Sequence, residues 1–166
     1  MTKKTSRRNF VKRSAALVAG AIVLPQIIPS SVFGKGGRIA PSDRIVIGSI
    51  GTGSQGMSNM RDFLKLKEAA QFVAVCDVDG RRLTKAKETV DLANKNSDCR
   101  AYGDYREFLE KEKLDAVSLA LPDHWHGIIY SEAAKKGWDV YGEKPICRTI
   151  SDGKSIVAAV KKYSNS

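Results

Sequence analysis

Short apolar runs that alternate with helical patterns constrain the fold of this chain most strongly. Residues 44–50, 72–76 and 116–121 are apolar at nearly every position, instead of at every second one. A strand with this pattern is buried on both faces, as in a parallel sheet that helices cover on each side. Between the runs, apolar residues recur at steps of three and four, which is the spacing of an amphipathic helix. The alternation predicts an α/β fold with a doubly wound parallel sheet.

The pattern predicts five strands and five helices. The strands are expected at residues 44–50, 72–76, 100–102, 116–121 and 139–142, and the helices at residues 55–67, 79–93, 104–112, 125–136 and 151–163. Asp104 and Glu107 have the spacing of a capping box at a helix start. Gly137 is expected to end the fourth helix, and Ser151 to cap the last one.

Length and charge exclude several classes of protein. The 166 residues suffice for one ordinary domain, and a hydrophobic content of 42% supports a packed core. Three cysteines are too few for a disulfide scaffold. The net charge of +10 is concentrated in residues 1–40, which hold eight Lys and Arg and no acid. No basic stripe interleaved with aromatics follows, so nucleic-acid binding is not expected.

The first 34 residues have the order of an export signal. A charged stretch at residues 3–13 precedes a ten-residue apolar run at residues 15–24, and small residues follow. A run of this length is too short to span about 30 Å of hydrocarbon, so no stable membrane span is predicted, although an uncleaved anchor remains the alternative. The sequence Ser-Arg-Arg-Asn-Phe-Val-Lys at residues 6–12 resembles the twin-arginine signal.

These features predict three segments. Residues 1–34 are a twin-arginine signal, residues 35–43 a linker, and residues 44–166 the folded domain. The predicted partner of the signal is the twin-arginine (Tat) export machinery, and the predicted location is the periplasm or another exported compartment.

A glycine-rich loop directly follows the first predicted strand and opens a helix. Gly51-Thr52-Gly53-Ser54-Gln55-Gly56 matches the pattern G-x-G-x-x-G in the context that a dinucleotide site requires. Gly51 allows a tight turn, Gly53 lets the main chain approach a pyrophosphate, and Gly56 lets the helix pack closely. The helix N-terminus then offers free N–H groups to the phosphates.

Asp77 supplies the second half of this pattern. It ends the second strand, 21 residues after Gly56, where a carboxylate can accept hydrogen bonds from both adenosine ribose hydroxyls. Because a carboxylate repels a 2′-phosphate, NAD is the predicted cofactor and NADP is less favoured, although Arg81 and Arg82 lie close by. The alternative role for Asp77 is a helix cap, for which Asp79 is better placed.

Histidines and cysteines suggest no other chemistry. His124 and His126 have the spacing of two zinc ligands, but no third ligand accompanies them, so no metal site is predicted. Cys76 is expected to be buried and inert. Cys99 and Cys147 could pair in an oxidising compartment, although their spacing does not argue for it.

Three separate stretches resemble one protein family. They are the glycine loop with Asp77, the sequence Leu-Pro-Asp-His-Trp-His at residues 121–126, and Glu-Lys-Pro at residues 143–145. In order and spacing they resemble the Gfo/Idh/MocA oxidoreductases, the group of glucose-fructose oxidoreductase and inositol dehydrogenase. The resemblance implies a Rossmann domain.

The resemblance also implies roles for individual residues. Lys144 would be catalytic, since in such proteins this lysine meets the nicotinamide and hydrogen-bonds a substrate hydroxyl. Glu143 would contact the nicotinamide ribose, and Pro145 would shape the loop, often through a cis peptide bond. Pro122 and His126 would lie against the cofactor.

Members of the family continue into a second, α+β domain that supplies much of the substrate pocket and a catalytic histidine. We therefore expect the NAD(P)-binding half of an exported oxidoreductase for a sugar, polyol or related hydroxy compound, truncated and with little activity alone. The alternatives are part of a glycoside hydrolase that works by transient oxidation, and a non-catalytic nucleotide-binding or assembly module. The predicted protein partner is a separate chain that carries the second domain, or a further copy of this chain in a homo-oligomer.

Overall fold

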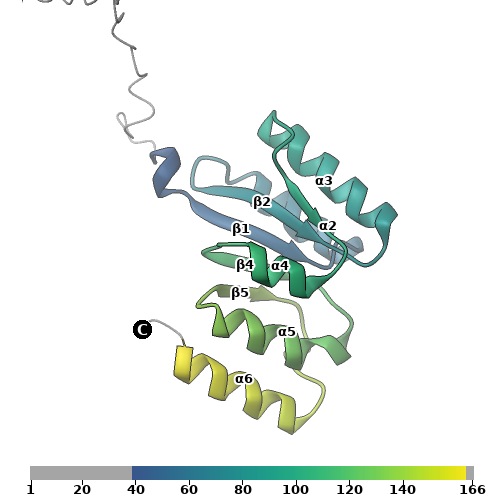
Figure 1. Cartoon of the computed structure of the whole chain (residues 1–166), viewed down its shortest axis with the longest axis vertical. Coiled ribbons are helices and arrows are strands. Elements are labelled where there is room, and N and C mark those ends of the chain that lie inside the picture. The colour runs from purple at the N-terminus through teal and green to yellow at the C-terminus, as the bar shows by residue number, and fades with distance from the viewer. Residues whose placement is uncertain (1–38, 164–166) are drawn as a thin grey trace, which may run out of the picture.

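All strands of the computed structural model lie in one parallel sheet (Figure 1). The structure describes residues 39–163, so the predicted signal lies outside the described residues. The strands are β1 (Ile45–Ile50), β2 (Ala70–Cys76), β3 (Arg100–Tyr102), β4 (Ala116–Leu119) and β5 (Asp139–Gly142). The helices are α2 (Ser54–Leu64), α3 (Gly80–Asn94), α4 (Tyr105–Lys111), α5 (Asp123–Lys135) and α6 (Ile150–Tyr163), preceded by a 3-10 turn at Pro41–Asp43.

The strand order is β3-β2-β1-β4-β5, which confirms the predicted doubly wound α/β fold. β1 lies between β2 and β4, so the chain reverses its direction across the sheet at this point. In sheets of this kind the connections on either side of the reversal diverge, and ligands bind outside the carboxyl ends of the strands there. The topology therefore singles out the ends of β1 and β4. No helix within residues 39–163 is both long enough and apolar enough to cross a membrane.

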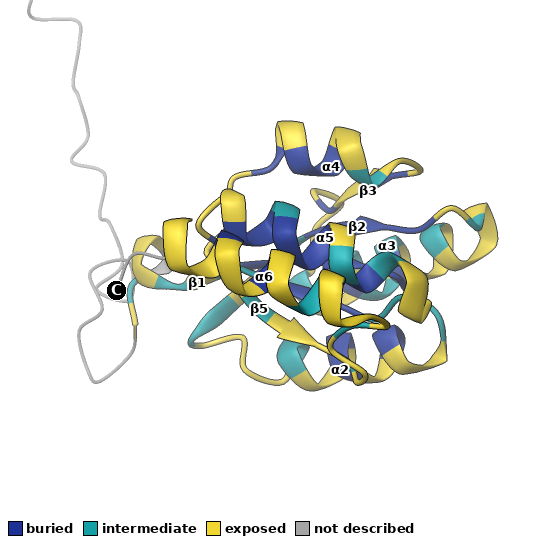
Figure 2. Ribbon diagram, turned by 90° about the horizontal axis from the view of Figure 1, so that it is seen from below, coloured by how far each residue is buried: buried dark blue, intermediate teal, exposed yellow. Residues whose placement is uncertain are grey.

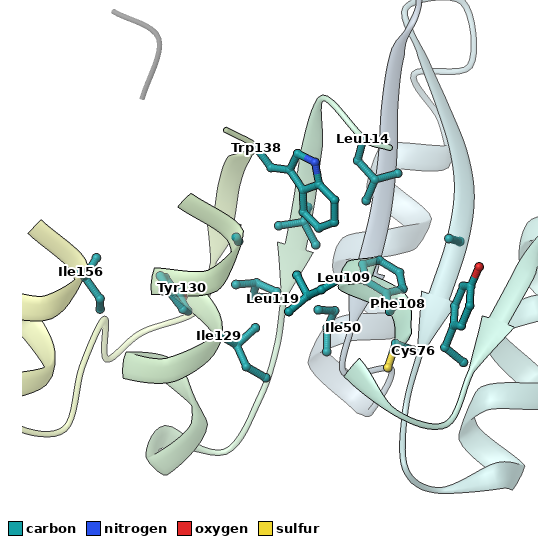
Figure 3. Packing of buried hydrophobic residues seen from close by; sticks show 14 residues of the cluster. Ile50, Cys76, Phe108, Leu109, Leu114, Leu119, Ile129, Tyr130, Trp138 and Ile156 are labelled. Atoms are coloured by element: carbon teal, nitrogen blue, oxygen red, sulfur yellow. The ribbon is translucent and has the colours of Figure 1, made fainter. Parts of the chain in front are cut away.

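The apolar core has two parts, one on each face of the sheet. One part packs α2 and α3 on the strands through Met57, Met60, Ala86 and Val90. The other packs α4, α5 and α6 on the opposite face (Figure 3). Figure 2 shows that the helices bury only the sides that face the sheet, as amphipathic helices should.

A bulge in β2 changes which of its side chains face each core. Ile47 of β1 pairs with Phe72, but the next residue, Gly48, pairs with Ala74, so Val73 is an extra residue. An extra residue shifts the alternation of side chains by one. Phe72 and Val75 therefore lie on the same face, although three positions separate them.

The predicted boundaries differ most near the end of β4 and at the end of α2, and β2 begins two residues earlier than predicted, at Ala70. β4 ends at Leu119 and α5 begins at Asp123, because Pro122 has no N–H for a strand ladder and its fixed φ suits the helix start. α2 ends at Leu64, three residues early. The N–H groups of Lys65 and Leu66 bond to carbonyls three residues back, which tightens the chain into a turn.

The predicted capping box at α4 is only partly right. Asp104 does cap the helix, but its carboxylate accepts from the N–H of Arg106, at 2.7 Å. Glu107 does not reach back and forms an ion pair with Lys111 one turn later, at 2.5 Å. The i,i+4 partner of opposite charge competes for the side chain that the box would need.

The predicted cap of α6 is wrong. The helix begins at Ile150, and Thr149 occupies the position expected for Ser151. The Thr149 hydroxyl accepts from the N–H of Asp152 at 3.1 Å, and the Asp152 carboxylate accepts from the N–H of Thr149 at 3.2 Å. This reciprocal pair is a capping box two residues upstream of the expected cap.

The three cysteines lie apart. Cys99 packs in the core beneath α2 and α3, whereas Cys147 packs against the core on the opposite face, so the two cannot pair. Burial raises the pKa of the Cys76 thiol to about 12, and the charge of Asp77 adds to this effect. The predicted inertness of Cys76 agrees with this environment.

A buried carboxylate ties the edge strand β3 to α4. Glu112 follows α4, and its side chain is fully buried. It accepts from Nε and a terminal nitrogen of Arg100, both at 2.6 Å, and from the hydroxyl of Tyr102 at 2.5 Å. Burial alone would raise the pKa of Glu112, but the donors on Arg100 and Tyr102 outweigh it and hold the pKa below its ordinary value.

We expect Glu112→Gln to lower the free energy of unfolding by about 2 kcal/mol at pH 7, because charge-assisted hydrogen bonds are lost. The pKa of Glu112 is lower in the folded state, so this stability is present above the unfolded-state pKa. It is lost as the pH falls through the folded-state pKa. Urea unfolding at pH 7 and in acid should show the gap between variant and wild type closing. The control is Glu110→Gln, at an exposed position in α4. Its free energy of unfolding should equal that of the wild type both at pH 7 and in acid.

Candidate functional site

Two glycines allow the loop after β1 to fold against its surroundings. Gly51 has a φ of +89°, and a Cβ placed on it would lie 2.2 Å from the carbonyl oxygen of Ala120. A Cβ on Gly56 would lie 2.0 Å from the carbonyl oxygen of Gly51. Neither position can accept a side chain without moving the main chain. The tight turn and the close packing predicted for these residues are therefore what the structure shows.

Gly53 differs from both, because its missing side chain leaves open space. A Cβ here would meet only the guanidinium of Arg82, at 3.7 Å. Gly53 is the N-cap of α2 and so provides no side chain to bond the first N–H groups, and the first turn holds no acid. This open helix N-terminus, with an arginine beside it, fits an anionic group such as a pyrophosphate.

Two adjoining cavities extend from this point along the carboxyl ends of the strands. One, of about 300 Å³, is lined by residues that include Gly53, Ser54, Gln55, Gly56, Leu121, Glu143 and Lys144. The other, of about 310 Å³, shares Gly53 and Leu121. Its other lining residues include Gly51, Asp77, Arg82, Pro122 and Trp125. The structure thus brings together the glycine loop, Asp77, Pro122 and the Glu143-Lys144 pair.

A larger cavity, of about 560 Å³, lies among β5, α5 and α6. Trp138, Ile146 and Ile156 line it, and none of the predicted site residues does. Size alone therefore does not identify the site, whereas the glycine loop and the topological reversal both lead to the smaller pair of cavities.

Asp77 is buried beneath the glycine loop. One carboxylate oxygen, Oδ2, accepts from the N–H of Thr52 at 2.7 Å and from its hydroxyl at 3.0 Å. The other, Oδ1, accepts from the N–H of Asp79 at 2.9 Å. Asp79 itself caps α3 by accepting from Arg81 and Arg82, as predicted. The carboxylate of Asp77 therefore anchors the loop, and where it lines the cavity one acceptor position on Oδ1 is not used by these bonds.

Three predicted residues lie outside the lining of both cavities. Thr52 is only 2% exposed, and its hydroxyl is directed at Asp77. His126 is fully buried, with Nε2 2.9 Å from the carbonyl oxygen of Leu121 and Nδ1 against that of Pro145. Pro145 follows a cis peptide bond. Direct contact of Thr52, His126 and Pro145 with a cofactor stays a prediction. The structure shows the hydrogen bonds by which Thr52 and His126 hold the loops.

Asn59 is a site residue that the sequence analysis missed. It is buried in α2, donates to Oε1 of Glu143 at 2.9 Å and accepts from Gln55, also at 2.9 Å. The hydroxyl of Tyr130 donates to the carbonyl of Glu143 at 3.0 Å. Glu143 is thus held from both α2 and α5. The i,i+4 spacing of Gln55 and Asn59 beside the buried methionines of α2 was the available signal.

The histidines are poorly placed for a metal. Both ring nitrogens of His126 face carbonyl oxygens, and His124 is exposed. Within residues 39–163, no three His, Cys, Asp or Glu side chains converge as metal ligands would.

We expect His126→Leu to lower the free energy of unfolding by about 2 kcal/mol, because the imidazole N–H no longer donates to a buried carbonyl oxygen, that of Leu121 or that of Pro145. Urea unfolding of the 166-residue chain would measure it. The control is His124→Leu, since His124 is exposed on the same helix turn and should be neutral. An equal loss in both variants would contradict the assigned role of His126.

Known proteins resemble this chain over most of its length. It is 27% identical over 170 residues to a glycosyl hydrolase family 109 protein of Shewanella baltica. The aligned region covers 94% of this chain and 37% of that protein. A protein of the same name from Shewanella putrefaciens is 28% identical over the same shares. The chain thus spans little more than a third of the length of these curated relatives.

Solved structures agree with the fold. The WlbA dehydrogenase from Bordetella pertussis, solved with NADH and UDP-GlcNAcA, is 25% identical with a TM-score of 0.65, over 72% of this chain and 35% of that one. A probable dehydrogenase from Thermotoga maritima is 28% identical with a TM-score of 0.61, over 72% and 34%. The model of the oxidoreductase family with an NAD-binding Rossmann fold matches residues 45–166. The chain therefore belongs to the Gfo/Idh/MocA oxidoreductase family, and NAD, the predicted cofactor, is the cofactor of its fold.

Proposed function

We propose that this chain is the NAD-binding half of an oxidoreductase that acts on a sugar, a polyol or a related hydroxy compound. The observation that carries the proposal is the convergence of the glycine loop, Asp77 and Lys144 on two adjoining cavities at the reversal of the sheet. Bound NAD would supply a hydride acceptor there. The chain's own residues would bind it, orient it and meet the substrate hydroxyl.

The dinucleotide would lie across the carboxyl ends of the strands. The N-terminus of α2 at Gly53 receives the pyrophosphate, since its N–H groups and dipole favour an anion. Asp77 lies on one side of Gly53 and accepts from the adenosine ribose. Glu143 and Lys144 lie on the other side, where the nicotinamide end would be. This order follows from the lining of the two cavities, with Gly53 common to both.

Lys144 is the residue that would meet the substrate. Its side chain is exposed at the cavity, next to Glu143, which Asn59 and Tyr130 hold in place. An ammonium in this position donates a hydrogen bond to a substrate hydroxyl and can take part in moving its proton. The fixed neighbour restricts where this donor can point, which is the contribution of the local fold to orientation.

Charges around Asp77 support NAD over NADP. Arg81 and Arg82 both pair with Asp79, at 3.6 and 3.9 Å, and no ion pair to Asp77 occurs within the described residues. A 2′-phosphate at the ribose would face the charge of Asp77 without a cation paired to it.

A glycoside hydrolase that uses transient oxidation is the second candidate. It is favoured by the glycosyl hydrolase family 109 relatives from Shewanella. Both candidates use the same nucleotide site. They differ in the fate of the cofactor, because a hydrolase returns NAD to its starting state in each turnover while an oxidoreductase consumes it.

The substrate side of the site would come from further protein. The curated relatives are longer than this chain, and the cavity beside Lys144 is open to solvent. A second domain, a partner chain that carries it or a second copy of the chain would complete the pocket. If the chain works without any of these three, it would instead be a non-catalytic nucleotide-binding or assembly module.

The nucleotide site can be tested by binding alone. We expect Gly53→Val to weaken NADH binding at least tenfold, about 1.4 kcal/mol, because the side chain fills the pyrophosphate position. Stability should be nearly unchanged, since the only neighbour is the end of a flexible arginine. Quenching or enhancement of NADH fluorescence measures the affinity.

Gly103→Val is the matched control, because a Cβ on Gly103 meets nothing within 4 Å and Gly103 lines neither cavity. It should bind NADH like the wild type. A wild-type chain that binds no NADH would overturn the proposed function, and equal affinity in the Gly53 variant would overturn the placement of the pyrophosphate.

Export through the twin-arginine route completes the proposal for residues 1–34. The supporting feature is the pair Arg7-Arg8 within its surrounding pattern. We expect Arg7→Lys with Arg8→Lys to leave the chain in the cytoplasm of the producing bacterium, although the charge is unchanged. Cell fractionation with immunoblotting measures this. Lys3→Arg with Lys4→Arg, outside the pattern, should still be exported, and export of both pairs alike would contradict the route.

A further inference from the structure

We propose that Thr52 sets the preference for NAD over NADP by fixing the carboxylate of Asp77. Thr52 is not a direct ligand in this proposal; it is a positioning residue beneath the glycine loop. The inference rests on the proposed nucleotide site and adds a determinant of specificity to it.

Hydrogen bonds within the protein already use most of the acceptor capacity of Asp77. A carboxylate offers about four lone-pair positions. Thr52 occupies two of them on Oδ2, through its N–H at 2.7 Å and its hydroxyl at 3.0 Å. The N–H of Asp79 occupies one on Oδ1, at 2.9 Å. One position on Oδ1 is left for a ribose hydroxyl.

Burial prevents the carboxylate from turning aside. Thr52 is 2% exposed and Asp77 is 8% exposed, so water cannot replace the bonds that a rotation would break. A ribose hydroxyl can donate to the remaining position. A 2′-phosphate has no proton to donate at neutral pH and would bring its charge against a fixed negative charge.

Arg82 is the cation that could bind a 2′-phosphate if the carboxylate of Asp77 were not fixed by Thr52. It lines the same cavity as Asp77, and its side chain is 60% exposed, 3.9 Å from Asp79. A guanidinium that can move in this position is a ready partner for a 2′-phosphate. The fixed carboxylate of Asp77, in the same cavity, opposes that use. Without the Thr52 hydroxyl only two main-chain N–H groups would hold Asp77, so its carboxylate could shift and the arginine could bind the phosphate.

The test compares variants that do and do not keep the hydroxyl. Thr52→Val keeps the shape and the main-chain N–H but removes the hydroxyl, and Thr52→Ala does the same with less volume. Thr52→Ser keeps the hydroxyl. Each 166-residue chain is titrated with NADH and with NADPH, followed by nucleotide fluorescence, and the ratio of the two dissociation constants is the readout. Urea unfolding shows which variants fold.

We expect the wild type and Thr52→Ser to bind NADH more tightly than NADPH. Thr52→Val and Thr52→Ala should narrow the ratio about tenfold, the order of one hydrogen bond to a charged group. An unchanged ratio in a folded hydroxyl-free variant would overturn the inference, even if both affinities fell, because a purely structural role weakens both nucleotides alike. A narrowed ratio in Thr52→Ser would also overturn it. A wild type that binds neither nucleotide overturns the proposed function itself, which is a distinct result.

Discussion

The close approach of main chain at Gly51, Gly56 and Ala120 is the constraint on which the site depends. A Cβ on either glycine would overlap a carbonyl oxygen, so α2 can begin directly above the ends of β1 and β4 only without side chains there. This contact aims the N-terminus of α2 at the cavities and places Gly53 between them. The hydrogen bond from the N–H of Gly51 to the carbonyl of Cys76 then connects the loop to the end of β2, where Asp77 follows.

Much of the fold could be predicted because its signals are local. Continuous apolar runs identify buried strands, and the glycine pattern after the first run identifies the turn into α2. Boundaries were less predictable where two local interactions compete. Lys111 takes Glu107 away from the expected capping box, and Thr149 with Asp152 forms one where Ser151 was expected. Such outcomes depend on which partner is nearer in space.

The interior of the site was harder to predict than its outline. The motifs predicted the loop, Asp77 and the Glu143-Lys144 pair at one edge of the sheet, and the structure places them along two adjoining cavities there, since the carboxyl ends of parallel strands share one edge. They did not show that Thr52 and His126 are directed inward, or that Asn59 bridges α2 to Glu143. These contacts join residues as far apart as 84 positions, and only the packed sheet determines them.

The position of the cysteines has a consequence for the life of the chain. All three belong to the described part; two are buried, and the fold holds together with every thiol reduced. Cys99 and Cys147, on opposite faces of the sheet, cannot be joined while the domain is folded. A disulfide between Cys99 and Cys147 therefore plays no part in holding the described residues together. The described fold is complete with its thiols reduced, so it needs no oxidant to reach this structure.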